Sequence, residues 1–152
     1  MILNLIYLLS LVVWIGSIVF FSFFVAPAIF KTLEREEAGK IVGVIFPKYY
    51  FISYIAGFIA LTILLTSSRT FFEPKVVLIF VMLCCSVFAG QIISPKARDL
   101  KPLIKSEENP DKLKELKFKF DRLHSLSVKL NGTVLFLGLI VLGYTSKNLS
   151  LS

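Results

Sequence analysis

The chain has 152 residues, of which 56% are hydrophobic, and its mean hydropathy is +0.80. A soluble domain of this length cannot bury that much apolar surface, so the composition excludes an ordinary soluble globular protein. The formal net charge of +7 would suggest a nucleic-acid partner in a soluble protein. In a membrane protein the position of each charge matters more than the sum, and we expect no nucleic-acid binding.

Four apolar stretches are long enough to cross a bilayer, which takes about 20 residues in a helix. They are residues 2–30, 44–66, 76–93 and 126–144. Because no water is available at mid-membrane, each stretch must satisfy its backbone groups internally, as a helix does. The sequence therefore predicts an all-α integral membrane protein, a four-transmembrane-helix bundle forming a single domain over residues 1–152.

The first apolar stretch is rich in phenylalanine and contains Pro27 near its end. The tripeptide Ala26-Pro27-Ala28 resembles a signal-peptide cleavage site, so a removable signal peptide is the alternative interpretation. No Lys or Arg precedes the stretch, and it is about twice as long as the apolar region of a signal peptide. We therefore expect it to remain as the first span.

An amphipathic segment precedes the second span. Ala38, Ile41, Val42 and Ile45 recur at helical spacing. Pro47 follows them, and a proline inside a helix is expected to kink or break it. The pattern predicts a short interfacial helix that leads into the second span.

The fourth helix is expected to begin well outside the membrane. The tripeptide Asn-Pro-Asp at residues 109–111 is a helix start: a capping Asn, a proline in the first turn and an acid favoured by the helix dipole. A helix from there to Tyr144 would be on the order of 50 Å long, against about 30 Å for the apolar core of a bilayer. The third helix is expected to continue past Pro95 alongside it. Together they would form a helical extension between helices 3 and 4, closed near residues 106–109.

The distribution of positive charge predicts the orientation. Thirteen of the 17 Lys and Arg residues fall on the side of the two longer loops and three on the opposite side. The positive-inside rule then predicts a multi-pass protein of the cell membrane, with residues 31–43 and 96–122 in the cytoplasm and both termini outside. The charged extension is interpreted as a solvated surface or, alternatively, as a docking surface for a partner or for anionic lipid.

Polar residues gather near the same end of the predicted bundle. A helical wheel places His124, Ser127 and Asn131 on one face of the fourth helix, and Gln91, Ser94 and Arg98 on one face of the third. Polar groups inside a membrane tend to face the bundle interior or a water-filled cavity. Two interpretations stay open, a ligand pocket or simple hydrogen bonding between helices. The candidate ligand-binding residues at this level are Tyr50, Gln91, Ser94, Arg98, His124, Ser127 and Asn131.

No catalytic or metal-binding set accompanies these residues. His124 is the one histidine of the chain, the spans contain no Asp or Glu, and Cys84 and Cys85 are adjacent. Adjacent cysteines lack the spacing of a redox or zinc motif. The sequence thus predicts no cofactor and no metal, and it leaves enzymatic activity open while favouring a non-enzymatic role.

Four stretches of the sequence, in this order and spacing, resemble the transmembrane-protein-205-like domain family of small four-helix membrane proteins. They are "WIGSIVFFSFFVAPAIF", "AGKIVGVIFPKYY", "ISPKARDL" and "FDRLHSLSVKLN". The resemblance implies that the family's signature positions fall on Trp14, Gly16, Pro27, Phe46, Pro47, Tyr50, Pro95, His124, Ser127 and Asn131. It adds Trp14 to the candidate ligand-binding residues.

A fainter resemblance links the chain to copper-resistance CopD-like membrane domains and to membrane protoporphyrinogen oxidases, whose membrane histidines serve metal or haem. Relatives can carry a histidine in the first helix, where this chain has Ile6-Tyr7. This difference excludes a bis-histidine site within one chain.

The leading functional hypothesis is a membrane protein that binds or helps to move a small amphipathic or cationic ligand, in a polar pocket between the third and fourth helices. The first alternative is an accessory subunit of a larger membrane complex, with the charged extension and the Phe-rich first helix as contact surfaces. The second is a haem- or quinone-dependent redox protein. The expected partner is the lipid bilayer, and another membrane protein or further copies of the chain stay open as additional partners.

Overall fold

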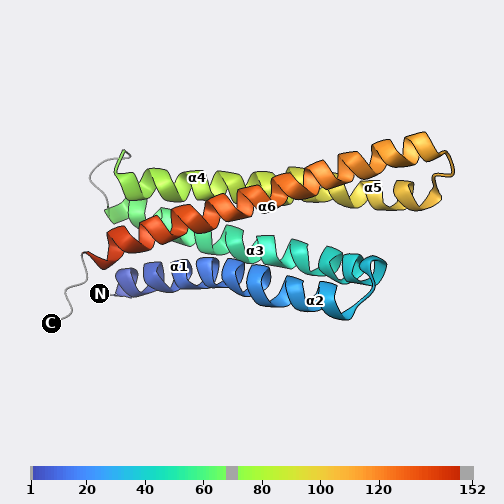
Figure 1. Ribbon diagram of the computed structural model, residues 1–152. Helices are drawn as coiled ribbons and strands as arrows, with labels where there is room; N and C mark the ends of the chain where they lie inside the picture. Colours follow the sequence, from blue (N-terminus) through green and yellow to red (C-terminus); the bar gives the residue numbers. More distant parts are fainter. Residues whose placement is uncertain (1, 68–71, 148–152) are drawn as a thin grey trace.

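A computed structural model describes residues 2–67 and 72–147, and within these ranges the chain is helical apart from short connections. Four helical segments are long and apolar enough to cross a membrane. They run side by side, alternating in direction, so that the beginning of the first and the end of the last lie at one end (Figure 1). The predicted all-α class with four candidate spans is confirmed.

The four segments are built from six α-helices and two π-helical turns in the described part of the chain. In chain order they are α1 (Ile2–Phe20), the π-turn η1 (Phe21–Val25), α2 (Ala26–Thr32), α3 (Arg35–Ser67), α4 (Pro74–Phe88), the π-turn η2 (Ala89–Ile93), α5 (Ser94–Ser106) and α6 (Pro110–Ser146). We refer to α1–α3 as the first hairpin and to α4–α6 as the second.

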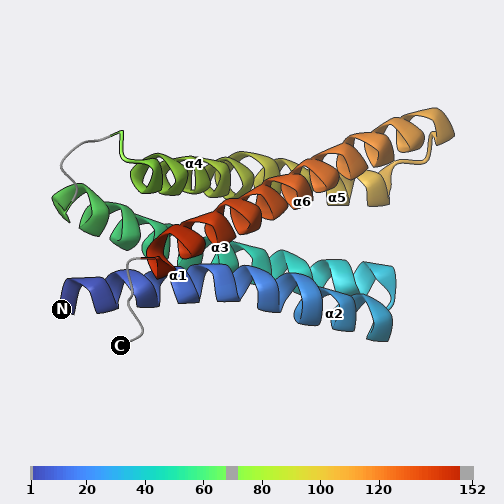
Figure 2. The ribbon, with the colours of Figure 1, turned by 60° about the vertical axis from the view of Figure 1, so that its left-hand side comes forward.

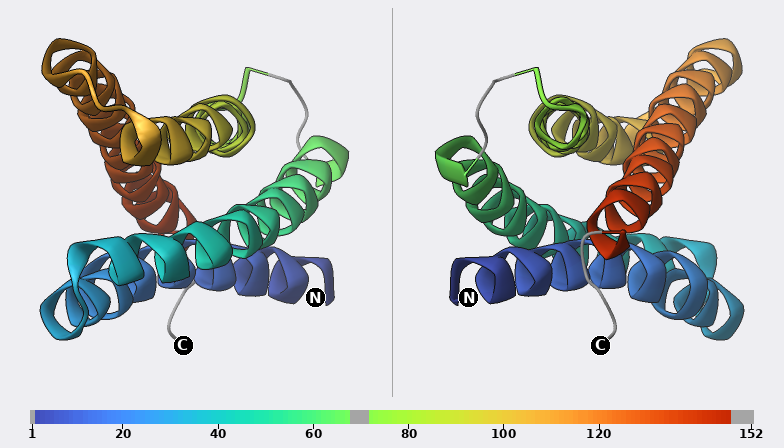
Figure 3. Two further views of the ribbon diagram at one scale, coloured as in Figure 1. Left: turned by 90° about the vertical axis from the view of Figure 1, so that its right-hand side faces the viewer. Right: turned by 90° about the vertical axis from the view of Figure 1, so that its left-hand side faces the viewer.

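The two hairpins cross at an angle rather than lying parallel. The C-terminal end of α6 lies beside α1, and the N-terminal end of α6 lies beside α5 (Figure 3). At the end of the bundle opposite the first residues, α5 and the start of α6 diverge from α2 and the start of α3 (Figure 2). We call this end, where most of the charged residues lie, the charged end.

Glycines permit close helix contacts in the middle of the bundle. Trp14 of α1 is fully buried, and a Cβ atom added to Gly57 of α3 would lie 2.8 Å from its ring. A Cβ atom added to Gly138 of α6 would lie 2.9 Å from Ile15. Small residues let transmembrane helices approach closely. The first contact packs α1 against α3 within the first hairpin, and the second joins the two hairpins at the centre.

Each π-turn is followed, after one further residue, by a proline. The backbone N–H of Ala26 donates to the carbonyl of Phe21, and that of Ser94 to the carbonyl of Ala89, each five residues back. Pro27 and Pro95 follow, and a proline has no N–H to donate. The wider turn rotates the side chains around the helix axis. Residues within and after it therefore share a face in a different pattern from those of a regular α-helix.

The expected break at Pro47 is not present, because α3 continues without interruption from Arg35 to Ser67. Proline removes one hydrogen bond from a helix, and transmembrane helices tolerate this loss when neighbouring groups compensate. Here both sides of Pro47 are packed: Val42 before it and Tyr50 after it are buried. Tertiary packing thus overrides the local preference, and the predicted interfacial helix is the first part of α3.

The predicted helical extension is confirmed. α5 and α6 continue beyond the apolar stretches and are joined at residues 107–109. The side-chain oxygen of Asn109 accepts hydrogen bonds from the backbone N–H groups of Asp111 (3.0 Å) and Lys112 (3.4 Å). This cap fixes the start of α6, a helix of 37 residues.

Candidate functional site

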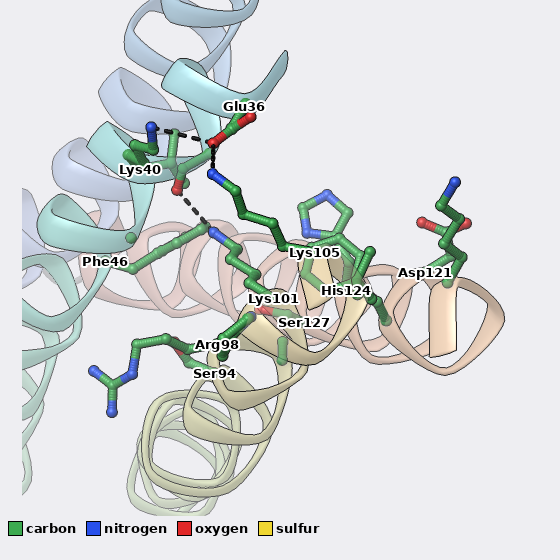
Figure 4. Close-up of a pocket in the computed structure, with 18 of the residues that line it drawn as sticks. Glu36, Lys40, Phe46, Ser94, Arg98, Lys101, Lys105, Asp121, His124 and Ser127 are labelled. Atoms are coloured by element: carbon green, nitrogen blue, oxygen red, sulfur yellow. Dashed lines mark hydrogen bonds and ion pairs between the residues drawn. The ribbon is translucent and has the colours of Figure 1, made fainter. Parts of the chain in front are cut away.

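A cavity of about 710 Å³ lies at the charged end, between the start of α3, α5 and the first part of α6. Its lining combines charged, polar and apolar side chains (Figure 4). The charged and polar side chains are Glu36, Lys40, Ser94, Arg98, Lys101, Lys105, Lys117, Asp121, His124 and Ser127. The apolar side chains are Phe30, Val42, Phe46, Ile93, Ala97, Pro102, Ile104 and Phe120, and Gly39 and Gly43 also line the cavity.

The cavity exists because the two hairpins diverge here and two glycines of α3 face α5. Cβ atoms added to Gly39 and Gly43 would lie 3.6 and 3.7 Å from Nζ of Lys101. The ammonium of Lys101 donates a hydrogen bond to the carbonyl oxygen of Gly39 at 2.7 Å. A lysine of the second hairpin thus reaches the backbone of the first.

An exposed ion pair forms a second bridge between the hairpins. Nζ of Lys105 lies 2.9 Å from a carboxylate oxygen of Glu36, which also lies 3.2 Å from Nζ of Lys40. The side chains of Lys105 and Glu36 are 74% and 59% exposed. Water and salt screen such a pair, so it contributes little to stability.

The electrostatic environment of the cavity is basic. Five of its lining residues are Lys or Arg, and two are carboxylates. Lys101 lies eight residues after the end of the third apolar stretch and Glu36 eight residues before the start of the second, about 12 Å along a helix in each case.

A network of neutral polar groups lies next to the cavity, on the side of the apolar core. The Tyr50 hydroxyl is 2.9 Å from the Ser127 hydroxyl, and the Asn131 side-chain amide donates to Tyr50 at 3.2 Å. Tyr49 donates to the Asn131 side-chain carbonyl at 3.3 Å. If Tyr50 donates to Ser127, the Ser127 hydroxyl hydrogen is free for an acceptor in the cavity, which Ser127 also lines.

The structure brings six of the eight predicted site residues together. Ser94, Arg98, His124 and Ser127 line the cavity, and the His124 ring stacks on Phe120 with centroids 6.2 Å apart. The remaining two of the six, Tyr50 and Asn131, belong to the adjacent network.

Gln91 and Trp14 do not line the cavity. Gln91 is exposed and lies in η2, where the wider turn invalidates a wheel drawn at 100° per residue. Trp14 is fully buried against Gly57, and its indole N–H has no hydrogen-bond partner among the described residues. Trp14 is therefore a core residue.

Sequence reasoning missed Lys101, Lys105 and Glu36. A signal for the first two was available, because Arg98, Lys101 and Lys105 are spaced three and four residues apart and so share a face of α5. Their contacts with Gly39 and Glu36 depend on how the hairpins cross, which no local pattern encodes.

The donor groups of the described residues are not arranged for a metal ion. Within residues 2–67 and 72–147, no three His, Cys, Asp or Glu side chains come close enough together to hold one. Cys84 and Cys85 are free cysteines, the first exposed and the second half-buried.

Four membrane-length helices with a polar cavity at one end define a small multi-pass helical membrane protein. Residues 9–106 match the family described as "Domain of unknown function (DUF4149)", and the chain belongs to this family. An uncharacterized protein of Aquifex aeolicus (strain VF5) is 36% identical over 94 residues, which are 62% of this chain and 67% of that protein. No solved structure matches. The matched region includes the cavity residues of α3 and α5 but not those of α6, such as His124 and Ser127.

Proposed function

We propose that this protein binds a small amphipathic molecule in the cavity at the charged end and helps to move it between the membrane and the adjacent water. The observation that supports this most directly is the mixed lining, charged on one part and apolar on another. The cavity volume falls within the range of about 300–1,000 Å³ that is typical of ligand pockets. A ligand with one polar and one apolar part matches both sides of such a cavity.

The charge of the lining distinguishes between the two kinds of ligand that the sequence suggested. Lys and Arg outnumber Asp and Glu by five to two, and like charges repel a cation. The lining therefore supports an amphipathic ligand and disfavours a cationic one. Ser127 supplies a hydroxyl group at the inner boundary of the cavity, where a polar group of the ligand would otherwise be unpaired.

We test binding by filling the cavity. Ala97 lines it and is half-buried, so Ala97→Phe should occupy ligand space and reduce binding of a fluorescent single-chain amphiphile to the purified protein by at least about tenfold. The matched control is Gly132→Phe, because Gly132 has open space around it, and it should bind like the parent. Thermal melting and size-exclusion elution report whether each variant is folded.

If Ala97→Phe is folded and binds as tightly as the parent, the ligand lies elsewhere and the proposal is wrong. Movement is measured separately, with the protein reconstituted in sealed vesicles. Transfer of the labelled amphiphile out of the bilayer should be faster with the parent than with Ala97→Phe.

The proposal includes the orientation, with the cavity on the cytoplasmic side. Its support is the bias of Lys and Arg, thirteen on the side of the charged end against three on the other. We also propose that the chain is related to the transmembrane-protein-205-like family. This relationship rests on the four sequence motifs, three of which fall within residues 9–106, the region that matches DUF4149.

An accessory subunit of a membrane complex is the second candidate. Two large apolar side chains of the extension, Leu103 and Phe118, are 52% and 68% exposed although they lie beyond the apolar stretches. Contiguous exposed apolar surface marks contact sites, and a partner that covered the extension would bury both side chains. Purification from native membranes in a mild detergent tests this candidate, and a chain that always migrates as a monomer contradicts it.

A further inference from the structure

The cavity at the charged end holds more positive charge than its own acidic groups neutralise. Glu36 already contacts Lys40 and Lys105. In the described ranges, Arg98 and Lys117 take part in no ion pair, and neither does Asp121. The cavity therefore offers cationic groups to an external anion.

Among these cations, Lys101 gives the strongest indication of an anion-binding site. Lys101 is half-buried and its ammonium donates to the neutral carbonyl of Gly39. No carboxylate of the described residues lies within ion-pair distance of this ammonium. A partly buried cation with a neutral partner is stabilised when an anion approaches it.

The depth of this group matches the lipid headgroups. Lys101 bonds to Gly39, five residues before the second apolar stretch begins at Val44, which corresponds to about 7.5 Å along the helix. The headgroup layer extends about 5–8 Å beyond the apolar core on each side. The Lys101 side chain therefore reaches back from its own helix position, about 12 Å beyond the third apolar stretch, to the expected depth of the lipid phosphates.

The apolar part of the lining indicates what accompanies the anion. Phe30, Phe46 and Phe120 line the cavity from three different helices. A free inorganic anion would gain nothing from these rings, whereas the glycerol and upper acyl segments of a lipid would bury apolar surface against them.

We propose that the cavity binds the phosphate headgroup of an acidic phospholipid, with Lys101 and Arg98 contacting the phosphate and the phenylalanines contacting the start of the acyl chains. Basic pockets between transmembrane helices are a known way to recognise acidic lipid headgroups. This inference rests on the proposed function, because it assigns the class of ligand to the same cavity.

The experiment is native mass spectrometry of the full chain in detergent, titrated with phosphatidylglycerol or with phosphatidylcholine of identical acyl chains. We expect phosphatidylglycerol to bind at least about tenfold more tightly. Lys101→Gln and Arg98→Gln should each reduce its affinity about fivefold, since a basic residue near the surface contributes about 1 kcal/mol. Lys101→Arg, which keeps the charge, should retain most of the affinity.

The control variant is Lys129→Gln, which removes an exposed cation of α6 that does not line the cavity. It should leave the preference for phosphatidylglycerol unchanged, whereas an equal loss in this variant would mean non-specific attraction and overturn the inference. Arg98 makes no ion pair in the described part of the chain, so Arg98→Gln keeps the test valid if Lys101→Gln does not fold.

Two further outcomes would overturn the inference without affecting the proposed function. Equal affinity for the two lipids would show an amphiphile site with no preference for anions. Competition by glycerol 3-phosphate at the concentration at which the lipid binds would show that the site recognises a soluble phosphate. Loss of binding of every amphiphile, by contrast, would contradict the proposed function itself.

Discussion

At the scale of single residues, the network beside the cavity shows how polar groups are satisfied inside a membrane bundle. Tyr50 is buried and makes two side-chain hydrogen bonds, to Ser127 and Asn131, whereas Tyr49 makes one, to Asn131. Hydrogen bonds between transmembrane helices contribute about 0.6 kcal/mol each on average. The contribution of the hydroxyl group can therefore be compared between Tyr50, which makes two bonds, and Tyr49, which makes one.

We expect Tyr50→Phe to lower the free energy of unfolding by about 1 kcal/mol and Tyr49→Phe by about half as much, in proportion to the bonds lost. Both substitutions keep the ring and its packing, so the difference reports on the hydroxyl groups. Unfolding in mixed micelles with increasing denaturing detergent measures it. An equal effect of the two variants would contradict the assigned network.

A second prediction at this scale concerns the closest helix contact. Gly57→Ala should destabilise the protein by about 1–3 kcal/mol, because its Cβ would overlap the ring of Trp14. Gly132→Ala, at a position with open space, should be neutral or stabilising by up to about 1 kcal/mol, since alanine favours a helix. Thermal melting of both variants compares them, and a similar loss in each would mean that Trp14 does not lie against Gly57.

At the scale of elements, the second hairpin depends on a cap outside the membrane. Asn109 accepts bonds from the N–H groups of Asp111 and Lys112 at the start of α6. The first turns of α6 contain few apolar residues and no bilayer surrounds them in the predicted arrangement, so local interactions determine whether they stay helical.

We expect Asn109→Ala to cost about 1 kcal/mol locally and to fray the start of α6 while leaving the spans intact. Faster hydrogen exchange at the amides of Asp111 and Lys112 would report the loss, with exchange in α4 unchanged. Asn109→Asp keeps an acceptor and should retain protection. Unchanged exchange in Asn109→Ala would show that the cap does not hold the helix.

The helix elements also show what the sequence can and cannot predict. The four span-length helices and the helix start at Asn109 follow from hydrophobic length and capping chemistry, which act locally, and the structure contains both features. The break expected at Pro47 is absent because packing on both sides keeps α3 helical through it. Gln91 left the predicted face because η2 inserts a wide turn, and the sequence pattern contains no signal of comparable strength for such a turn.

The sequence predicted those parts of the candidate site in which the residues lie on the same helix. Ser94 with Arg98, and His124 with Ser127, share helix faces and do line one cavity. The contact of Lys101 with Gly39 joins residues 62 positions apart. It depends on the crossing of two hairpins, and residue spacing within one helix carries no information on that crossing.

At the scale of the whole molecule, the orientation decides which compartment the cavity faces. In a background without Cys84 and Cys85, single cysteines at Ser106 and Ser146, both exposed, are treated in intact cells with an impermeant maleimide. The charge bias predicts labelling at position 146 and not at 106. The opposite pattern would reverse the topology, and labelling of both after membrane permeabilisation is the control.

The exposed bridge between Lys105 and Glu36 has a consequence for the rate at which the cavity exchanges its contents. Together with the Lys101 bond it joins the diverging hairpins at the charged end, and exposed ion pairs of this kind are weak and screened by salt. We therefore expect the Lys105–Glu36 bridge to break readily and not to limit entry into the cavity. The residence time of a bound molecule is then set by its own contacts with the lining, and higher ionic strength should shorten it.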